Sequence, residues 1–146
     1  MSNAQLLQSN LELVVSRDPD LMQIFYTTLF ERYPSVQPLF GRNSRDEQAK
    51  MLTEAVAMLV SKVDDPQFVE TTMLAVGRKH VDYGVEDHMY AWVGECLVAT
   101  LAQVSGEDWN DALEDGWTAT LEAISAIAIQ GAAAERAERA TQPATS

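Results

Sequence analysis

The sequence has few of the side chains from which proteins build metal centres and disulfides. Its 146 residues include one cysteine, Cys96, and two histidines. A single cysteine excludes an internal disulfide and fits a reducing compartment, so we expect a cytoplasmic protein. A structural zinc site needs four Cys or His ligands, which is more than this chain supplies.

Long hydrophobic runs and clusters of positive charge are also absent. No apolar run approaches the ~20 residues that span a bilayer, and the N-terminus lacks the features of a signal peptide, so we expect no membrane partner. Asp and Glu number 22 against ten Lys and Arg, which gives a net charge of −12 at pH 7. Nucleic acid is therefore not an expected partner, whereas a basic protein is compatible with this charge.

Strand alternation, hairpin dipeptides and internal repeats are missing as well. We find no GxGxxG, P-loop or EF-hand pattern, and Ser105 and Ser125 lack the strand-turn-helix context of a catalytic nucleophile. Pairs of acidic residues leave a two-carboxylate hydrolase open, although the same pairs are typical of solvated helix faces. What the sequence does contain, from end to end, is apolar residues at helical spacing.

This spacing predicts one all-α domain of six or seven helices. From Gly131 onward the large apolar residues disappear, so we expect a folded domain over residues 1–131 and an Ala-rich, frayed or disordered tail over residues 132–146. Helix starts are predicted from capping patterns; they are Asp18-Pro19, Ser44 with Glu47, Asp65-Pro66, and Ser105 with Asp108.

One histidine stands out in this pattern. His80 follows Val69, Met73 and Val76 at helical spacing, which turns its side chain inward. A core histidine bonded to a backbone carbonyl explains this placement, and so does a helix-end histidine favoured by the dipole. A cofactor that brings most of its own coordination is the third explanation, because a porphyrin needs only one axial imidazole. His88 lies in a polar connection, and we expect it to face solvent.

Four motifs, in this order along the chain, are FYTTLFERYPSVQPLF (Phe25 to Phe40), EQAKML (Glu47 to Leu52), GRKHVDYGV (Gly77 to Val85) and YAWVGECL (Tyr90 to Leu97). Together they resemble bacterial globins, most closely the haem domain of flavohaemoglobins and the related single-domain bacterial haemoglobins. The resemblance runs from about Leu11 to about Ile129. It implies a globin fold around a buried haem pocket, with haem b (iron protoporphyrin IX) as the cofactor.

The resemblance also implies roles for individual residues. His80 matches the proximal haem ligand and is the expected metal ligand. Tyr26 and Gln48 match the distal tyrosine and glutamine, which are expected to bind the gas ligand. The other expected haem contacts are Phe40, Leu52, Val85, Tyr90 and Val93.

The chain departs from the family pattern at the end of the last helix. Ala132 stands where flavohaemoglobins have a glutamate that joins the proximal histidine and tyrosine. Glu135 lies one turn away and replaces that glutamate only if the helix stays ordered that far. Without such a carboxylate the imidazole is less anionic and releases less electron density to the iron.

The leading functional hypothesis is reversible binding of O₂, with NO and CO as further ligands, as in an oxygen carrier. Two hydrogen-bond donors in a dry pocket predict slow O₂ release. Three alternatives stay open at this point. They are a nitric oxide dioxygenase that forms nitrate with a separate flavin and NAD(P)H reductase, a haem-based gas sensor, and a haem-free helical fold with a pocket for another ligand.

Overall fold

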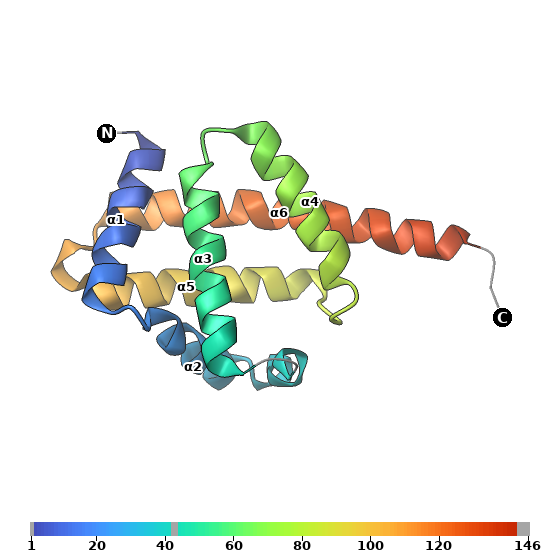
Figure 1. Ribbon diagram of the computed structural model, residues 1–146, viewed down its shortest axis with the longest axis horizontal. Coiled ribbons are helices and arrows are strands. Elements are labelled where there is room, and N and C mark those ends of the chain that lie inside the picture. The colour runs from blue at the N-terminus through green and yellow to red at the C-terminus, as the bar shows by residue number, and fades with distance from the viewer. Residues whose placement is uncertain (1, 42–43, 143–146) are drawn as a thin grey trace.

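Helices account for nearly all of the described residues, which are 2–41 and 44–142 of this computed structural model (Figure 1). No strand occurs among them, which confirms the all-α prediction. The elements are α1 (Asn3–Arg17), α2 (Leu21–Arg32), the 3-10 helix η1 (Pro34–Phe40), α3 (Arg45–Ser61), α4 (Pro66–His80), α5 (Asp87–Ser105), the 3-10 helix η2 (Gly106–Asp108) and α6 (Asp111–Thr141).

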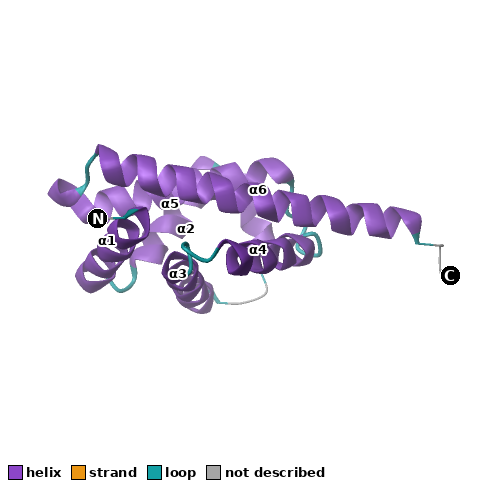
Figure 2. Ribbon diagram, turned by 90° about the horizontal axis from the view of Figure 1, so that it is seen from above, coloured by secondary structure: helices purple, strands orange, loops and turns teal. Residues whose placement is uncertain are grey.

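The helices form two layers. α5 and α6 run antiparallel, and α1, α3 and α4 lie across them (Figures 1 and 2). The core between the layers contains Trp117, whose indole Nε1 donates to Asn10 Oδ1 at 2.9 Å. Asn10 in turn donates to Ser105 Oγ at 2.9 Å, so this buried polar chain is paired and joins α1, α5 and α6.

Two of the predicted helix starts are correct. The Ser44 hydroxyl accepts from the Glu47 N–H at 3.2 Å and begins α3. Asp65 Oδ1 accepts from the Phe68 N–H at 3.1 Å, and Pro66 is the first residue of α4. In both cases a side-chain oxygen satisfies an N–H that has no partner within the helix.

The other two predicted starts are wrong, because the Asp18 side chain accepts locally from the Asp20 N–H at 3.0 Å and a tertiary contact takes the Ser105 hydroxyl. Asp18 is the C-cap of α1, and α2 begins only at Leu21. Ser105 is the last residue of α5 and is fully buried, where it accepts from Asn10. The N-cap of α6 is instead Asn110, whose side chain accepts a hydrogen bond from the first turn.

The last helix continues to Thr141 and so differs from the frayed tail that we expected from residue 132 onward. Arg78 on α4 binds both carboxylate oxygens of Glu138, at 3.0 and 3.1 Å. Arg136 pairs with Asp87 at 3.1 Å, at the start of α5. These pairs tie an alanine-rich segment of high helix propensity to the rest of the molecule. Residues 143–146 of the expected tail lie outside the described residues.

The crossing of α4 and α6 brings two helix backbones into direct contact. A Cβ at Gly77 would lie 1.8 Å from the carbonyl oxygen of Ala128, and one at Gly131 would lie 2.2 Å from that of Leu74. Both glycines are buried. Only a residue without a side chain fits there. This contact lies one turn before His80 and determines where α4 ends.

Replacing Gly77 with alanine is therefore expected to lower the free energy of unfolding by about 3 kcal/mol, since the two backbones must separate to admit the Cβ. Gly94→Ala on α5 is the matched control, because its Cβ would lie 3.9 Å from Leu121 Cβ, an ordinary contact. The control should be as stable as the wild type or more stable by about 0.5–1 kcal/mol. Urea unfolding of the three proteins measures the difference, and wild-type stability of Gly77→Ala would contradict the crossing described.

Candidate functional site

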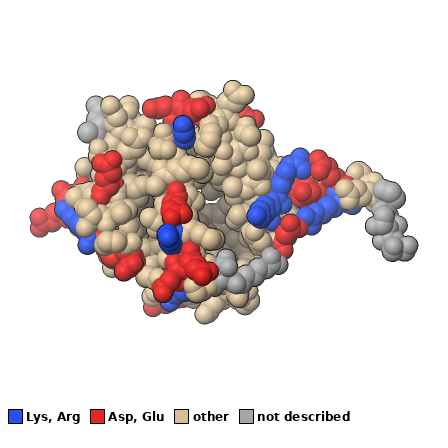
Figure 3. Space-filling model, viewed as in Figure 1, with Lys and Arg blue, Asp and Glu red and all other residues tan. Residues whose placement is uncertain are grey.

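The molecule is hollowed between α3 and α4 (Figure 3). The same view as a ribbon shows that the first turns of α3 and the last turn of α4 border this hollow (Figure 1). Seen from above, α2 and α5 lie beyond them (Figure 2). The helices that carry the predicted site residues therefore surround one space.

His80 is the last residue of α4 and is half-buried. Its Nδ1 lies 2.7 Å from the carbonyl oxygen of Val76, so the Nδ1–H tautomer donates to that oxygen and leaves Nε2 with a lone pair. Burial lowers the pKa of His80 below its ordinary 6.5, with the bond to Val76 acting in the opposite direction. The ring is thus neutral at pH 7 and has one nitrogen available to a metal.

Tyr26 lies on α2 and is almost completely buried, with 4% of its surface exposed. Its ring packs edge-on against Phe40, with ring centroids 5.5 Å apart. Burial raises the pKa of the Tyr26 phenol to about 12, although Arg45 acts weakly in the opposite direction. The hydroxyl therefore keeps its proton near neutral pH and can act as a hydrogen-bond donor.

Gln48, in the first turn of α3, lies beside Tyr26. The Tyr26 hydroxyl donates to the Gln48 carbonyl oxygen over a long 3.4 Å. The Gln48 side-chain Nε2 donates to the Phe40 carbonyl oxygen at 2.8 Å, which ties α3 to the end of η1. Three residues that the sequence separates by up to 22 positions are thus brought together at one place.

The structure places the remaining predicted contacts on α3, on α5 and just after the end of α4. Leu52 is one turn beyond Gln48 on α3, and Val93 lies on α5; both are half-buried against the core. Val85 follows the end of α4, and its N–H donates to the His80 carbonyl oxygen at 3.2 Å. Its position is therefore coupled to the end of α4.

Tyr90 is the most informative of the predicted contacts. Its ring centroid lies 6.3 Å from that of His80. Its hydroxyl is buried and has no hydrogen-bond partner among the described residues, and burial raises its pKa. An unpaired buried hydroxyl next to His80 indicates that the site is incomplete without a bound group.

Ala132 stands where the family pattern has a glutamate, and among the described residues no other carboxylate is hydrogen-bonded to His80 in its place. Ala132 is buried, with 1% exposed. Although α6 is ordered past Glu135, that carboxylate pairs with Arg139 at 3.6 Å, on the same helix. Within the described residues, the His80 side chain has its hydrogen bond to the Val76 carbonyl oxygen.

One neighbour of His80, Tyr83, was not predicted from the sequence. The ring of Tyr83 lies edge-on to that of His80, with centroids 5.4 Å apart. Its position three residues after His80, in the turn that ends α4, is the signal that was available. Such a spacing places two side chains on the same side of a helical turn.

Over residues 2–41 and 44–142, no group of three or more His, Cys, Asp or Glu residues is arranged to hold a metal ion. The same part of the chain contains no helix with the length and apolarity that a bilayer crossing requires.

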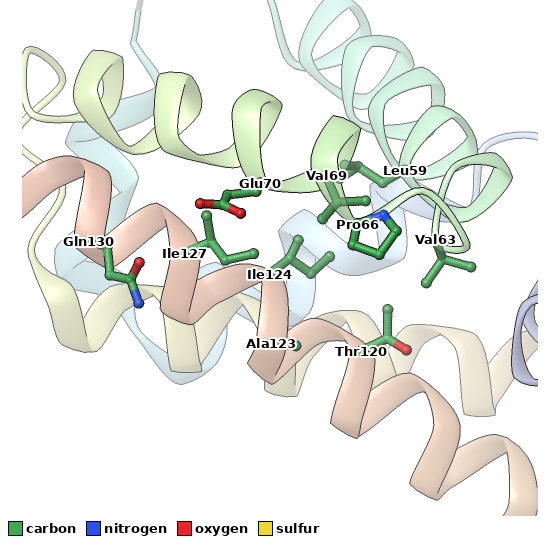
Figure 4. Close-up of a pocket in the computed structure, with 10 residues that line it drawn as sticks. All are labelled: Leu59, Val63, Pro66, Val69, Glu70, Thr120, Ala123, Ile124, Ile127 and Gln130. Atoms are coloured by element: carbon green, nitrogen blue, oxygen red, sulfur yellow. The ribbon is translucent and has the colours of Figure 1, made fainter.

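A separate cleft lies at the other end of α4, where α3 ends and α4 crosses the middle of α6 (Figure 4). Its volume is about 450 Å³. Leu59, Val69 and Ile127 belong to its apolar lining, and Glu70 and Gln130 lie together at one side. None of the predicted site residues lines it.

Residues 23–128 match the family model for globins. The chain belongs to the globin family. Among curated relatives, the flavohemoprotein of Bordetella pertussis is 32% identical over 111 residues, which cover 75% of this chain and 28% of the relative. The flavohemoprotein of Pseudomonas aeruginosa is 29% identical over 135 residues, covering 89% and 34%. The globin thus spans about a third of the length of these relatives.

Solved structures agree on the globin fold. A bacterial globin from Campylobacter jejuni superposes with a TM-score of 0.79 at 23% identity, covering 92% of this chain and 97% of the other. An engineered carbene transferase, derived from a putative nitric oxide dioxygenase of Rhodothermus marinus, gives a TM-score of 0.82 at 22% identity, covering 94% and 96%.

The residues of this globin fit a haem. A porphyrin supplies four equatorial nitrogens, so one imidazole completes the protein's share of the coordination. His80 provides such an imidazole with a free Nε2, and Tyr90 provides a buried hydroxyl without a partner next to it. Tyr26 and Gln48 belong to other helices, α2 and α3, and contact each other through the 3.4 Å hydrogen bond from the Tyr26 hydroxyl to the Gln48 carbonyl oxygen.

Replacing Tyr26 with phenylalanine should reduce the loss of stability at alkaline pH. In the unfolded chain a tyrosine ionises near pH 10, whereas burial raises the pKa of Tyr26 to about 12. The unfolded state therefore releases its proton first, and stability is lost as the pH rises from 10 towards 12. Urea unfolding at a series of alkaline pH values measures this loss. Wild-type and variant curves that fall in parallel would show that Tyr26 is not shielded from solvent.

Proposed function

We propose that this globin holds haem b through His80 and reversibly binds O₂, and also NO and CO, on the side of Tyr26 and Gln48. When bound, the haem supplies the iron at which a diatomic gas is held. The observation that carries the proposal is the arrangement of His80. Its Nδ1 is occupied by the Val76 carbonyl oxygen at 2.7 Å, so Nε2 is oriented and available.

Tyr26 and Gln48 determine how strongly O₂ is held. A polar oxygen ligand accepts hydrogen bonds, and the Tyr26 hydroxyl and the Gln48 amide NH₂ are both donors. The present partner of the Tyr26 hydroxyl is 3.4 Å away, so little is lost when the hydroxyl turns to a ligand. To bind a ligand, Gln48 either gives up its hydrogen bond to the Phe40 carbonyl oxygen or donates the second N–H of its amide to the ligand. Two neutral donors of ~1 kcal/mol each slow O₂ release by roughly tenfold or more.

The proximal side favours reversible binding over bond cleavage. His80 donates to a neutral carbonyl oxygen, and Ala132 offers no carboxylate. A carboxylate partner would give the imidazole more anionic character and increase electron release towards the iron. With a carbonyl partner that release is smaller. We therefore prefer reversible O₂ binding to oxidative catalysis as the function of this globin.

Nitric oxide dioxygenation is the second candidate, and the likeness to flavohemoproteins favours it. Two donors that retain O₂ also keep it in place for a reaction with NO. The reaction consumes electrons, which a separate flavin and NAD(P)H reductase would deliver. Nitrate formation over many turnovers with such a reductase tests this candidate, and a single turnover that then stops leaves O₂ binding as the function.

The first experiment is an absorption spectrum of the haem-supplied protein, ferric and then ferrous with CO. The wild type should show a strong Soret band that sharpens with CO, and His80→Ala should lose it. His88→Ala is the matched control, since His88 is exposed, with its Nε2 3.5 Å from Glu86 and its ring against Trp92. Absence of stoichiometric haem from the wild type would overturn the proposal.

Tyr26→Phe and Gln48→Leu should each speed up O₂ release about fivefold, and the double variant more than tenfold, because each removes a donor worth ~1 kcal/mol. Release of CO, a poorer hydrogen-bond acceptor, should change less. Tyr33→Phe is the control, because the Tyr33 hydroxyl donates to Glu95 at 2.8 Å, away from the pocket. Stopped-flow replacement of O₂ by CO gives the rates, and unchanged rates in both single variants would refute the assigned donors.

A further inference from the structure

The charges of this globin are distributed very unevenly along the chain. The 55 residues from Val81 to Glu135 contain 11 Asp and Glu and no Lys or Arg. This segment includes α5 and most of α6, which run antiparallel side by side (Figure 1). Half of all the acidic residues, 11 of 22, thus lie in this stretch of the chain, with no basic residue among them.

A groove of about 610 Å³ lies between α5 and α6. Its floor consists of small and aliphatic residues that are only half-buried, including Gly94, Val98, Ala102 and Leu121. On α5 the lining extends from Asp87 to Ala102, which is roughly 22 Å at 1.5 Å per residue, or about four helical turns. Small side chains between two antiparallel helices leave a channel into which the side chains of a third helix can pack.

The walls of the groove are acidic. Asp87, Glu95, Glu114 and Glu122 line it, and its lining contains no Lys or Arg. Arg136 neutralises Asp87 at 3.1 Å and Arg32 neutralises Glu95 at 2.7 Å, both from outside the lining.

The two groove carboxylates on α6, Glu114 and Glu122, are not neutralised in this way. Among the described residues, neither Glu114 nor Glu122 takes part in an ion pair. Glu114 accepts only from the neutral Trp109 Nε1–H, at 2.8 Å. One wall of the groove therefore carries uncompensated negative charge.

We propose that this groove is a docking surface for a basic, amphipathic helix of another protein. The apolar face of such a helix covers the floor, and its Lys and Arg residues meet Glu114 and Glu122. A second copy of this chain does not suit the groove, because two copies meeting here would place both sets of carboxylates against each other. Charge complementarity thus selects a basic partner.

The docking surface reaches the proposed haem site at one end. Tyr90 lines the groove, and its ring centroid lies 6.3 Å from that of His80. A partner seated in the groove contacts Tyr90 and is separated from His80 by this one side chain. This consequence rests on the proposed function, whereas the docking surface itself does not.

The probe is a synthetic 18-residue helical peptide with Leu and Ala on one face and Lys and Arg on the other. A peptide of the same composition in scrambled order is the control for charge attraction alone. Both are titrated into the haem-supplied full chain, and amide chemical shifts locate the binding. The helical peptide should shift signals of α5 and α6 along the groove, and the scrambled peptide should bind at least tenfold more weakly.

Glu122→Lys should raise the Kd of the helical peptide about fivefold, because it replaces an attraction with a repulsion. Glu12→Lys, an equal change of charge at an exposed position of α1, should leave the Kd within twofold. Thermal unfolding checks that both variants are folded.

Equal binding of the two peptides, or equal effects of the two variants, would overturn the proposal in favour of general attraction to an acidic protein. Sedimentation of the protein alone shows whether the groove instead joins two copies, which would also overturn it. Peptide binding does not depend on gas binding. A protein that binds the peptide but no O₂ refutes the proposed function and leaves the docking surface intact.

Discussion

The backbone contact between α4 and α6 is the constraint on which the proximal side depends. α4 has only two fully buried residues, Met73 and Gly77, so few side chains anchor it in the core. Its position follows largely from Gly77 against Ala128 and from Gly131 against Leu74. Ion pairs from Arg78 and Arg139 add further attachments near its end, but exposed pairs contribute little individually. The place of His80 is thus set by two glycines rather than by the residues around its ring.

The distal side is built in a different way. Tyr26, Phe30 and Phe40 form a cluster of rings with centroids 5.5–5.9 Å apart, and Gln48 joins this cluster through a hydrogen bond to Phe40. These contacts involve side chains, which change rotamer at lower cost than a packed backbone moves. The position of His80 therefore depends on a backbone contact, whereas Tyr26 and Gln48 are placed by side-chain contacts. This division suits the proposed function, in which the site keeps its cofactor and exchanges its gas.

Helical spacing in the sequence was enough to predict the all-α fold, whereas His80, which this spacing turns inward, is half-buried in the structure. Local patterns failed where a tertiary contact outweighed them, as at Ser105, which bonds to Asn10 in the core instead of capping α6. The glycines at the α4–α6 crossing could not be predicted, because nothing in a single sequence says which two helices meet. The grouping of Tyr26 with Gln48 came from the family resemblance alone, since neither residue is unusual on its own helix.

Inside the site, neutral Ala132 stands where the family pattern has a carboxylate, whereas on the surface α5 and α6 carry many carboxylates. Ala132 is buried, and among the described residues neither the His80 imidazole nor the Tyr90 hydroxyl has a hydrogen bond to a carboxylate. The acidic residues of α5 and α6 lie instead on the outer groove, where Glu114 and Glu122 are exposed to solvent. Charge in a solvent-exposed position is screened over about 8 Å at physiological ionic strength, so it affects a charged partner far more than it affects the iron. In the proposed function the reactivity of the haem therefore depends mainly on the neutral groups within the pocket, and in the proposed docking the charge of the groove acts on the basic partner.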